Sequence, residues 1–510
     1  MKVPDAATNS SFKSSPRLGK IDLGAVAWFS LFMLLGTLAI RYPLLLLGCV
    51  GIAAGVGFCW LLVIGVRRAD LELWQVFALI AVSGYMLLNY GFENLTVHLG
   101  GFPIIISYGL MYASLALAIA SNRQLIAKTL QEFPVRWMLA LIALTAFHLV
   151  LDVPAYGIWA LRDSTMCIDG IFMLLGIAWA MQSSNIVFLT KWMLVLFILN
   201  LFYSFTQPWG ERLWSWSPVS GVFLKVPILG NYNGRGDILL AGAVFCICVG
   251  SYVVKRQQWI MLLLAGVQFL GIAIAQTRRM YLGAVVVLVI LLLLGEAKKF
   301  AKLLILIPAA ILVIFVATTV GGIEISGRIG PVNLAFFKEH IRSIHTSEGT
   351  PGSAVESRFS ARDEALEHFY EHPVVGVGFG QPLLADIDQN NGAVTRMPHN
   401  SSFTYLARLG VIGFIMWIAF HLSLMRRFLY AFRQRYSCNK RIYALVLWLF
   451  LFYVLFMIAS LVEGPFEFPS GAVPFYFFMG FALGLIRWHL SDKVKSSARL
   501  ETFVGNLEQV

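Results

Sequence analysis

The adjacent arginines Arg278 and Arg279, in the segment AQTRRMYLG, are the residues of this sequence best suited to bind an anion. A guanidinium group stays charged at physiological pH and binds phosphate oxygens through two parallel hydrogen bonds. The pair lies at the start of an apolar run, so it would meet a ligand at a membrane surface. The alternative is that both side chains extend to lipid headgroups and bind no particular ligand.

A third arginine, Arg235, lies in the segment ILGNYNGRGDILL and also precedes an apolar run. The flanking glycines let a ligand approach the backbone closely, and the two asparagines offer hydrogen bonds suited to a sugar. The same letters also fit a Gly-Asn turn in which Asp237 caps a helix.

His399, in MPHNSSFTYLARLGVIGF, is a candidate general base, because an imidazole can take a proton from a hydroxyl near neutral pH. A lone histidine is more often structural, and four others precede it in the same loop. What distinguishes His399 is its position at the membrane edge, next to the hydrogen-bonding side chain of Asn400. Glu463 and Glu467, in LVEGPFEFPSG, can orient a sugar or His399, although a solvated loop also carries such residues.

The composition shows which elements must hold these residues. The chain has 510 residues, of which 58% are hydrophobic and 13% charged, which is too apolar for an ordinary soluble domain. The net charge of +12 lies mostly in short clusters at the ends of apolar runs, a pattern that orients membrane helices and argues against nucleic-acid binding. The first apolar run is long and followed at once by others, so we interpret it as a spanning helix and not as a cleaved signal.

The expected fold is an all-α polytopic integral membrane protein with about 12–14 transmembrane helices. Each span is an apolar run of roughly 16 to 23 residues, about the length that crosses a bilayer. The predicted spans are 23–40, 43–65, 73–93, 103–120, 136–151, 168–184, 187–206, 237–254, 258–276, 281–295, 302–320, 403–425, 442–462 and 471–488.

Basic residues fall on one side of this arrangement when both termini are cytoplasmic. The basic residues of the cytoplasmic loops and C-terminal tail are then Arg67, Arg68, Arg123, Lys128, Arg136, Lys191, Lys255, Arg256, Lys298, Lys299, Lys302, Arg426, Arg427, Arg433, Arg435, Lys440, Arg441, Lys493, Lys495 and Arg499. Arg278 and Arg279 are exceptions on the outer side, which strengthens the case that they bind a ligand.

The predicted organisation has five parts. A basic cytoplasmic tail (1–22) precedes transmembrane helices (23–320) with an outer loop near 207–236; a large outer loop (321–402), C-terminal transmembrane helices (403–488) and a cytoplasmic tail (489–510) follow. The large loop has helical patterning of its own, which must stop before Pro373.

Six cysteines are scattered along the chain without a CxxC pair or a histidine at metal-ligand spacing. We interpret them as small buried residues, so the sequence predicts no disulfide framework and no metal site.

Three segments together resemble the signature region of the O-antigen ligase and polymerase superfamily of bacterial envelope proteins. SRFSARDEALEHFYEHPVVGVGFG followed by PHNSSFTYLARLGVIGF resembles its loop, TRRMYLG resembles its Ser-Arg-Gly element, and GNYNGRGDILLA resembles its Gly-Asn-x-Asn element. The resemblance covers roughly residues 220–425. In the second segment Thr277 replaces the family's serine and Arg279 its glycine.

The resemblance implies a glycosyltransferase in the bacterial cytoplasmic (inner) membrane that acts on the periplasmic face without a metal or other cofactor. The donor would be a glycan on polyprenyl (undecaprenyl) diphosphate, and the acceptor a hydroxyl of lipid A-core or of a growing chain. By this analogy His399 and Arg278 are the catalytic residues. The substrate-binding candidates are Arg235, Arg279, Arg358 and Asn400.

Other functions stay open at this point. A repeat-unit polymerase needs the same leaving-group site as a ligase. A transporter of polysaccharide or lipid-linked glycan suits the number of spans, but the spans between 237 and 320 have almost no charged residues and no internal repeat is evident. A membrane scaffold whose large loop binds partners is the third alternative.

Overall fold

The computed structural model describes residues 71–490, apart from short gaps, and all of them belong to the unit Leu62–Val510. The gaps are residues 100–101, 122–126, 223–224, 231–234, 254–257, 323, 326, 329, 334, 336–337, 339–349, 385–386, 389–392, 395 and 436–438. The predicted tail 1–22, the predicted spans 23–40 and 43–65, and residues 491–510 lie outside the described residues.

The protein is an all-α polytopic membrane protein, as predicted. Seven helices within the described part of the chain are long and apolar enough to cross a bilayer. They are α7 (Phe133–Tyr156), α10 (Ser183–Phe205), α14 (Gln258–Ala275), α16 (Ala297–Phe315), α19 (Ser401–Arg433), α20 (Lys440–Ser460) and α21 (Pro469–Leu485). Shorter helices occupy other predicted spans: α3 (Leu73–Leu88), α5 (Ile106–Ser121), α12 (Arg235–Cys248) with α13 (Gly250–Val253), and α15 (Arg278–Leu293).

The predicted span 168–184 is not one continuous helix. The chain runs through α8 (Ile158–Ile168), a 3₁₀ turn η1 (Asp169–Phe172) and α9 (Met173–Trp179). Gly170 lies against the Met138 side chain, where a Cβ atom would be 2.0 Å from the sulfur. The close contact and the buried Asp169 in this turn explain why apolar content alone gave the wrong element here.

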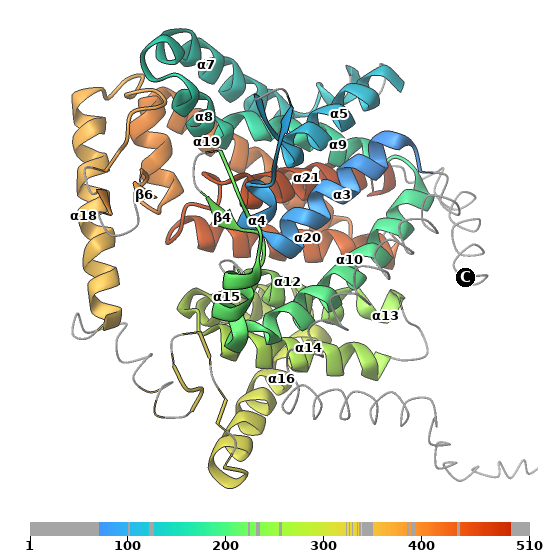
Figure 1. The fold of residues 1–510 in the computed structure, drawn as a ribbon. Helices are drawn as coiled ribbons and strands as arrows, with labels where there is room; N and C mark the ends of the chain where they lie inside the picture. Colours follow the sequence, from blue (N-terminus) through green and yellow to red (C-terminus); the bar gives the residue numbers. More distant parts are fainter. Residues whose placement is uncertain are drawn as a thin grey trace, which may run out of the picture. The chain divides into compact units, whose positions relative to one another are not determined.

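Helix α21 is almost completely buried and packs against α9, α3, η1 and α20. A second group forms around α12, which packs against α14, α10, α15 and α20. Figure 1 shows α20 and α21 between the helices of these two groups. The end of α20 and the turn that follows it therefore lie where the two groups meet.

The remaining elements are short. They comprise α4 (Tyr90–Glu93), η2 (Gln207–Trp209), α11 (Gly210–Trp216), π-helical turns η3 (Val316–Val320) and η4 (Ile486–Leu490), and the antiparallel pairs β1 (Thr96–Leu99) with β2 (Phe102–Ile105), β3 (Val219–Ser220) with β4 (Val226–Pro227), and β5 (Ile387–Asp388) with β6 (Ala393–Val394).

Among its described residues, the predicted large loop contains one long helix, α18 (Thr350–Glu371), which packs against α19. It ends before Pro373, as the sequence predicted, because a proline cannot donate the backbone hydrogen bond that continues a helix. The loop is thus partly helical, and Figure 1 shows α18 beside the membrane helices.

The turn after α18 fills a break in α19. Gly410, inside α19, has φ 60° and ψ −163°, a backbone conformation that is not helical. The backbone groups freed by the break bond to the turn: Val377 N donates to Ala407 O (2.9 Å) and Val411 N donates to Pro373 O (2.9 Å). A Cβ atom on Gly376 would lie 2.3 Å from the Arg408 backbone, so only glycine permits this approach. The Pro-x-x-Gly-x-Gly turn is therefore a structural part of a broken membrane helix.

A buried ion cluster fixes the same turn to α8. Asp163 accepts hydrogen bonds from Arg408 Nη2 (2.9 Å), Arg396 Nη2 (3.2 Å) and the Gly380 backbone (3.3 Å). Arg408 and Asp163 are fully buried, and each neutralises the charge of the other. Either charge would be costly to bury without its partner. Because Arg396 and Arg408 lie on either side of His399, the cluster also fixes the segment that carries this histidine.

Candidate functional site

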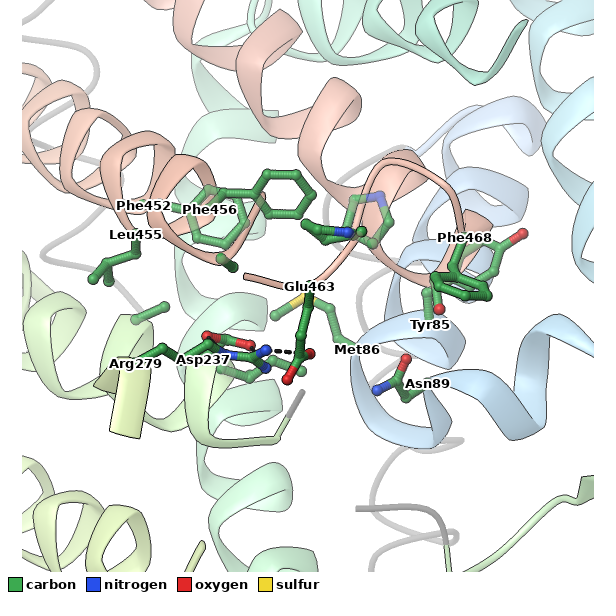
Figure 2. Close-up of a pocket in the computed structure, with 18 of the residues that line it drawn as sticks. Tyr85, Met86, Asn89, Asp237, Arg279, Phe452, Leu455, Phe456, Glu463 and Phe468 are labelled. Atoms are coloured by element: carbon green, nitrogen blue, oxygen red, sulfur yellow. Dashed lines mark hydrogen bonds and ion pairs between the residues drawn. The ribbon is translucent and has the colours of Figure 1, made fainter. Parts of the chain in front are cut away.

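A cavity of about 540 Å³ opens where the two helix groups meet (Figure 2). Its walls come from elements that are far apart in the sequence. The lining residues are Tyr85, Met86, Asn89, Tyr90, Phe197, Asp237, Ile238, Ala241, Arg279, Arg358, His399, Phe452, Leu455, Phe456, Ala459, Glu463, Gly464, Pro465, Phe468, Ser470, Gly471, Pro474 and Phe478.

Arg279 supplies the buried cation of this cavity. Its Nε donates to Asp237 Oδ1 at 3.1 Å, its Nη2 bonds the other oxygen of the same carboxylate, and its Nη1 forms an ion pair with Glu463. Figure 2 shows the three side chains gathered below Phe452, Leu455 and Phe456 of α20.

The position of Arg279 opposes the field of its own helix. It is the second residue of α15, and the N-terminus of a helix carries a partial positive charge that disfavours a cation. Asp237, in the first turn of α12, compensates for this cost. The two helix ends can meet because Gly236 is small, since a Cβ atom there would be 2.9 Å from Met280.

His399 lies directly before α19 and has φ 50°, a left-handed conformation that is uncommon for a residue with a side chain. Its side chain is exposed to the cavity, yet the surrounding protein displaces enough water to lower its pKa. The negative charge of Glu463 acts to raise that pKa and the positive charge of Arg358 acts to lower it. The imidazole is therefore neutral near pH 7, the form that can accept a proton.

Asn400 is the N-cap of α19. Its Oδ1 accepts from Ser402 N (3.0 Å) and Phe403 N (3.4 Å), while its Nδ2 donates to Leu461 O (2.7 Å). It thus joins the His399 segment to the turn that carries Glu463.

Three more arginines add positive charge around these groups. Arg278 and Arg358 repel each other electrostatically, Arg358 also acts on His399, and Arg328 interacts with Glu463 and Arg279. Among the described residues of this region, Arg279 pairs with both Asp237 and Glu463, and Arg328 also interacts with Glu463. A cluster of cations of this kind suits an anionic ligand.

The six predicted site residues are placed differently. Arg279, Arg358 and His399 line the cavity, and Asn400 caps the neighbouring helix. Arg278 is next to Arg279 but is not among the lining residues. Arg235 begins α12, and its side chain lies outside the described residues.

Sequence reasoning did not single out several groups of this site. Arg328 lies in ISGRIGP, a glycine-flanked arginine like Arg235, and that pattern was the available signal. Asp237 was interpreted as a helix cap, although the structure pairs it with Arg279. Tyr85, Asn89 and Tyr90 come from the N-terminal half and are part of no motif.

The cavity has two further walls. One is apolar and formed largely by α20 and α21, with Phe452, Phe456 and Phe478, whereas the other includes Asn89 and the side chain of Tyr85, whose hydroxyl is buried. The arrangement offers a hydrocarbon-compatible surface and hydrogen-bonding groups around one cationic centre.

The described residues include no group of three histidine, cysteine, aspartate or glutamate side chains positioned to hold a metal ion.

Comparison with known families gives one match. Residues 259–418 match the family model described as O-antigen ligase. This match supports membership of the O-antigen ligase superfamily. No curated protein matches the chain. The O-antigen ligase region contains Arg278, Arg279, Arg358, His399 and Asn400, whereas Asp237 and Glu463 lie on either side of it. The matched family implies a glycan-transferring enzyme of the ligase or polymerase type.

Proposed function

We propose that the protein transfers a glycan from a polyprenyl diphosphate to an acceptor hydroxyl at this cavity. The observation that carries the proposal is that a buried guanidinium, Arg279, and a neutral imidazole, His399, open onto the same space. The acceptor would be a lipid A-core sugar, which makes the enzyme a ligase. A repeat-unit polymerase is the close alternative.

The reaction is a single displacement at the anomeric carbon. The acceptor oxygen forms a bond to that carbon, the bond from the carbon to the diphosphate oxygen breaks, and its electron pair stays on the diphosphate. His399 takes the proton of the acceptor hydroxyl, a contribution of about 10²–10⁴-fold in rate. Arg279 meets the charge that develops on the leaving group, supported by Arg278 and Arg358. Displacement from one side inverts the anomeric configuration.

The other walls fit the rest of such a donor. A polyprenyl chain is apolar, and the phenylalanines of α20 and α21 offer it a surface beside the cationic centre. Asn89 offers hydrogen bonds to sugar hydroxyls. We place the cavity on the periplasmic side of the inner membrane with both chain termini in the cytoplasm, which agrees with the distribution of basic residues.

Substitution at the cavity tests the proposal. Arg279→Ala and His399→Ala are each expected to lower attachment of glycan to the acceptor by at least about 100-fold, measured by gel analysis of the envelope polysaccharide in a complemented deletion strain. Glu367→Gln, an exposed carboxylate of α18 that does not line the cavity, is the matched control and should retain attachment. Normal attachment in both cavity variants, at wild-type membrane levels, would remove the enzyme assignment from this cavity.

The deletion strain separates the two forms of the proposal. Long lipid-linked chains that accumulate without an acceptor indicate a ligase, whereas single lipid-linked repeat units indicate a polymerase.

A further inference from the structure

The guanidinium proposed to bind the diphosphate already has two carboxylate partners. Asp237 holds it through Nε and Nη2, and Glu463 pairs with Nη1. A diphosphate that approaches Arg279 meets two negative charges, so it must displace at least one of them to form a bidentate contact.

The two carboxylates differ in how firmly they are held. Asp237 uses both oxygens on Arg279, is 28% exposed and belongs to a helix. Glu463 makes its ion pair through Oε2 with one nitrogen, is 42% exposed and lies in the turn between α20 and α21. Glu463 is therefore the carboxylate that an incoming anion displaces more easily.

Glu463 also acts on the proposed base. Its charge interacts with His399, and the two segments are joined by the hydrogen bond from Asn400 Nδ2 to Leu461 O (2.7 Å). Among the described residues, the charged or titratable groups that interact with Glu463 are Arg279, Asp237, Arg328 and His399. Of these, His399 is the one whose charge changes during the proposed reaction.

We propose that Glu463 is an exchangeable counter-ion: a diphosphate that binds Arg279 displaces its carboxylate, which then pairs with His399. This inference rests on the proposed function and adds a positioning residue to it. The displaced carboxylate orients the imidazole and stabilises the imidazolium that forms when His399 takes the acceptor proton. Donor binding thereby strengthens the base, so proton removal is coupled to the arrival of the leaving group.

Anion binding gives the first test. With purified protein in detergent and inorganic pyrophosphate as the probe, Glu463→Gln is expected to raise the affinity about three- to tenfold because it removes a competing charge. Asp237→Asn is expected to lower the affinity, because it loosens the guanidinium. The measurement is isothermal titration calorimetry at low ionic strength, with Glu367→Gln as the matched control at wild-type affinity.

The protonation of His399 gives the second test. Diethyl pyrocarbonate modifies neutral imidazole, so the pH dependence of His399 modification, followed by peptide mass spectrometry, reports its apparent pKa. Pyrophosphate should raise that pKa in the wild type by about 0.5–1 unit more than in Glu463→Gln, where no carboxylate can move to the ring. Glu463→Asp, which keeps the charge, should restore most of the difference.

Each of the two tests can overturn the inference. A loss of pyrophosphate affinity in Glu463→Gln would mean that Glu463 only holds Arg279 in place. An equal pyrophosphate-induced shift in wild type and Glu463→Gln would mean that the carboxylate does not reach His399. Neither result touches the proposed function, which fails separately if Arg279→Ala and His399→Ala retain glycan attachment.

Discussion

At the residue scale, the site depends on which of two adjacent arginines faces the cavity. The sequence favoured Arg278 as the catalytic cation by analogy, with Arg279 as a substrate-binding residue, but the structure places Arg279 between Asp237 and Glu463. A helix turns by about 100° per residue, so neighbours point in different directions. Sequence alone could not tell which neighbour points inward, because both are arginine.

The pH dependence of transfer follows from His399. Its pKa is lowered by partial burial, and Arg358 lowers it further. The rate should rise with pH while imidazolium loses its proton, below the ordinary histidine value of about 6.5, and stay level above it. Arg358→Gln removes the opposing charge, so it should move this acid limb to higher pH. Plots of log(kcat/KM) against pH for the wild type and Arg358→Gln measure this shift. The prediction is contradicted if the rate falls at the same pH in the two proteins.

A second prediction concerns stability and Glu467. Its side chain is 3% exposed and accepts a hydrogen bond from Thr404 Oγ1, and burial raises its pKa to about 7. Because the folded pKa exceeds the ordinary value of 4.5, the protonated form favours folding. The contribution is full below about pH 4.5 and is lost as pH rises through about 7, an effect of up to about 3 kcal/mol.

Glu467→Gln keeps a neutral side chain of the same shape, so its melting temperature should fall less than that of the wild type between pH 5 and 8. Burial also raises the pKa of Glu93 to about 7. The melting temperature of Glu93→Gln should therefore depend less on pH in the same way. Scanning fluorimetry in detergent is suitable, and identical slopes in wild type and variant would exclude this role.

At the element scale, the break in helix α19 explains why the turn 373–378 contains glycines. The turn 373–378 supplies backbone partners at the break, so this segment of the motif is a fixed structural part. The sequence predicted that α18 stops before Pro373 and that a membrane helix follows His399. It did not predict the break, because Gly410 inside an apolar run also fits an ordinary helix.

Gly376→Ala tests this element. Gly376 has φ +76°, and a Cβ atom would lie 2.3 Å from the Arg408 backbone. We expect a loss of about 2–4 kcal/mol in stability, seen as a lower melting temperature and a lower yield of monodisperse protein. Gly109→Ala, where no atom lies within 4 Å of the added Cβ, is the matched control. A wild-type melting temperature for Gly376→Ala would show that the turn can move away from α19.

At the scale of the whole molecule, the apolar pattern predicted most of the architecture. Nearly every predicted span within the described residues corresponds to a helix, because length and hydrophobicity alone define a membrane helix. The discontinuity around Asp169 was missed, since a short polar break in an apolar run gives little signal.

The site was less predictable than the fold, because its parts come together only through packing. Asp237 and Arg279 are brought together by α12 and α15, and Glu463 approaches from the turn after α20. Tyr85 and Asn89 come from a region in which the sequence offered only hydrophobicity. No spacing rule links positions so distant in the chain.

The break in α19 also has a consequence for biosynthesis. Residues 373–378 leave the ribosome before the helix whose open backbone they complete, so the matching segment is available when that helix enters the lipid. A chain that lacked this segment would place unpaired amide groups in hydrocarbon. We expect quality-control proteases to degrade such a chain. A deletion in this loop should therefore lower the amount of protein in the membrane, and the loss of activity would follow from that.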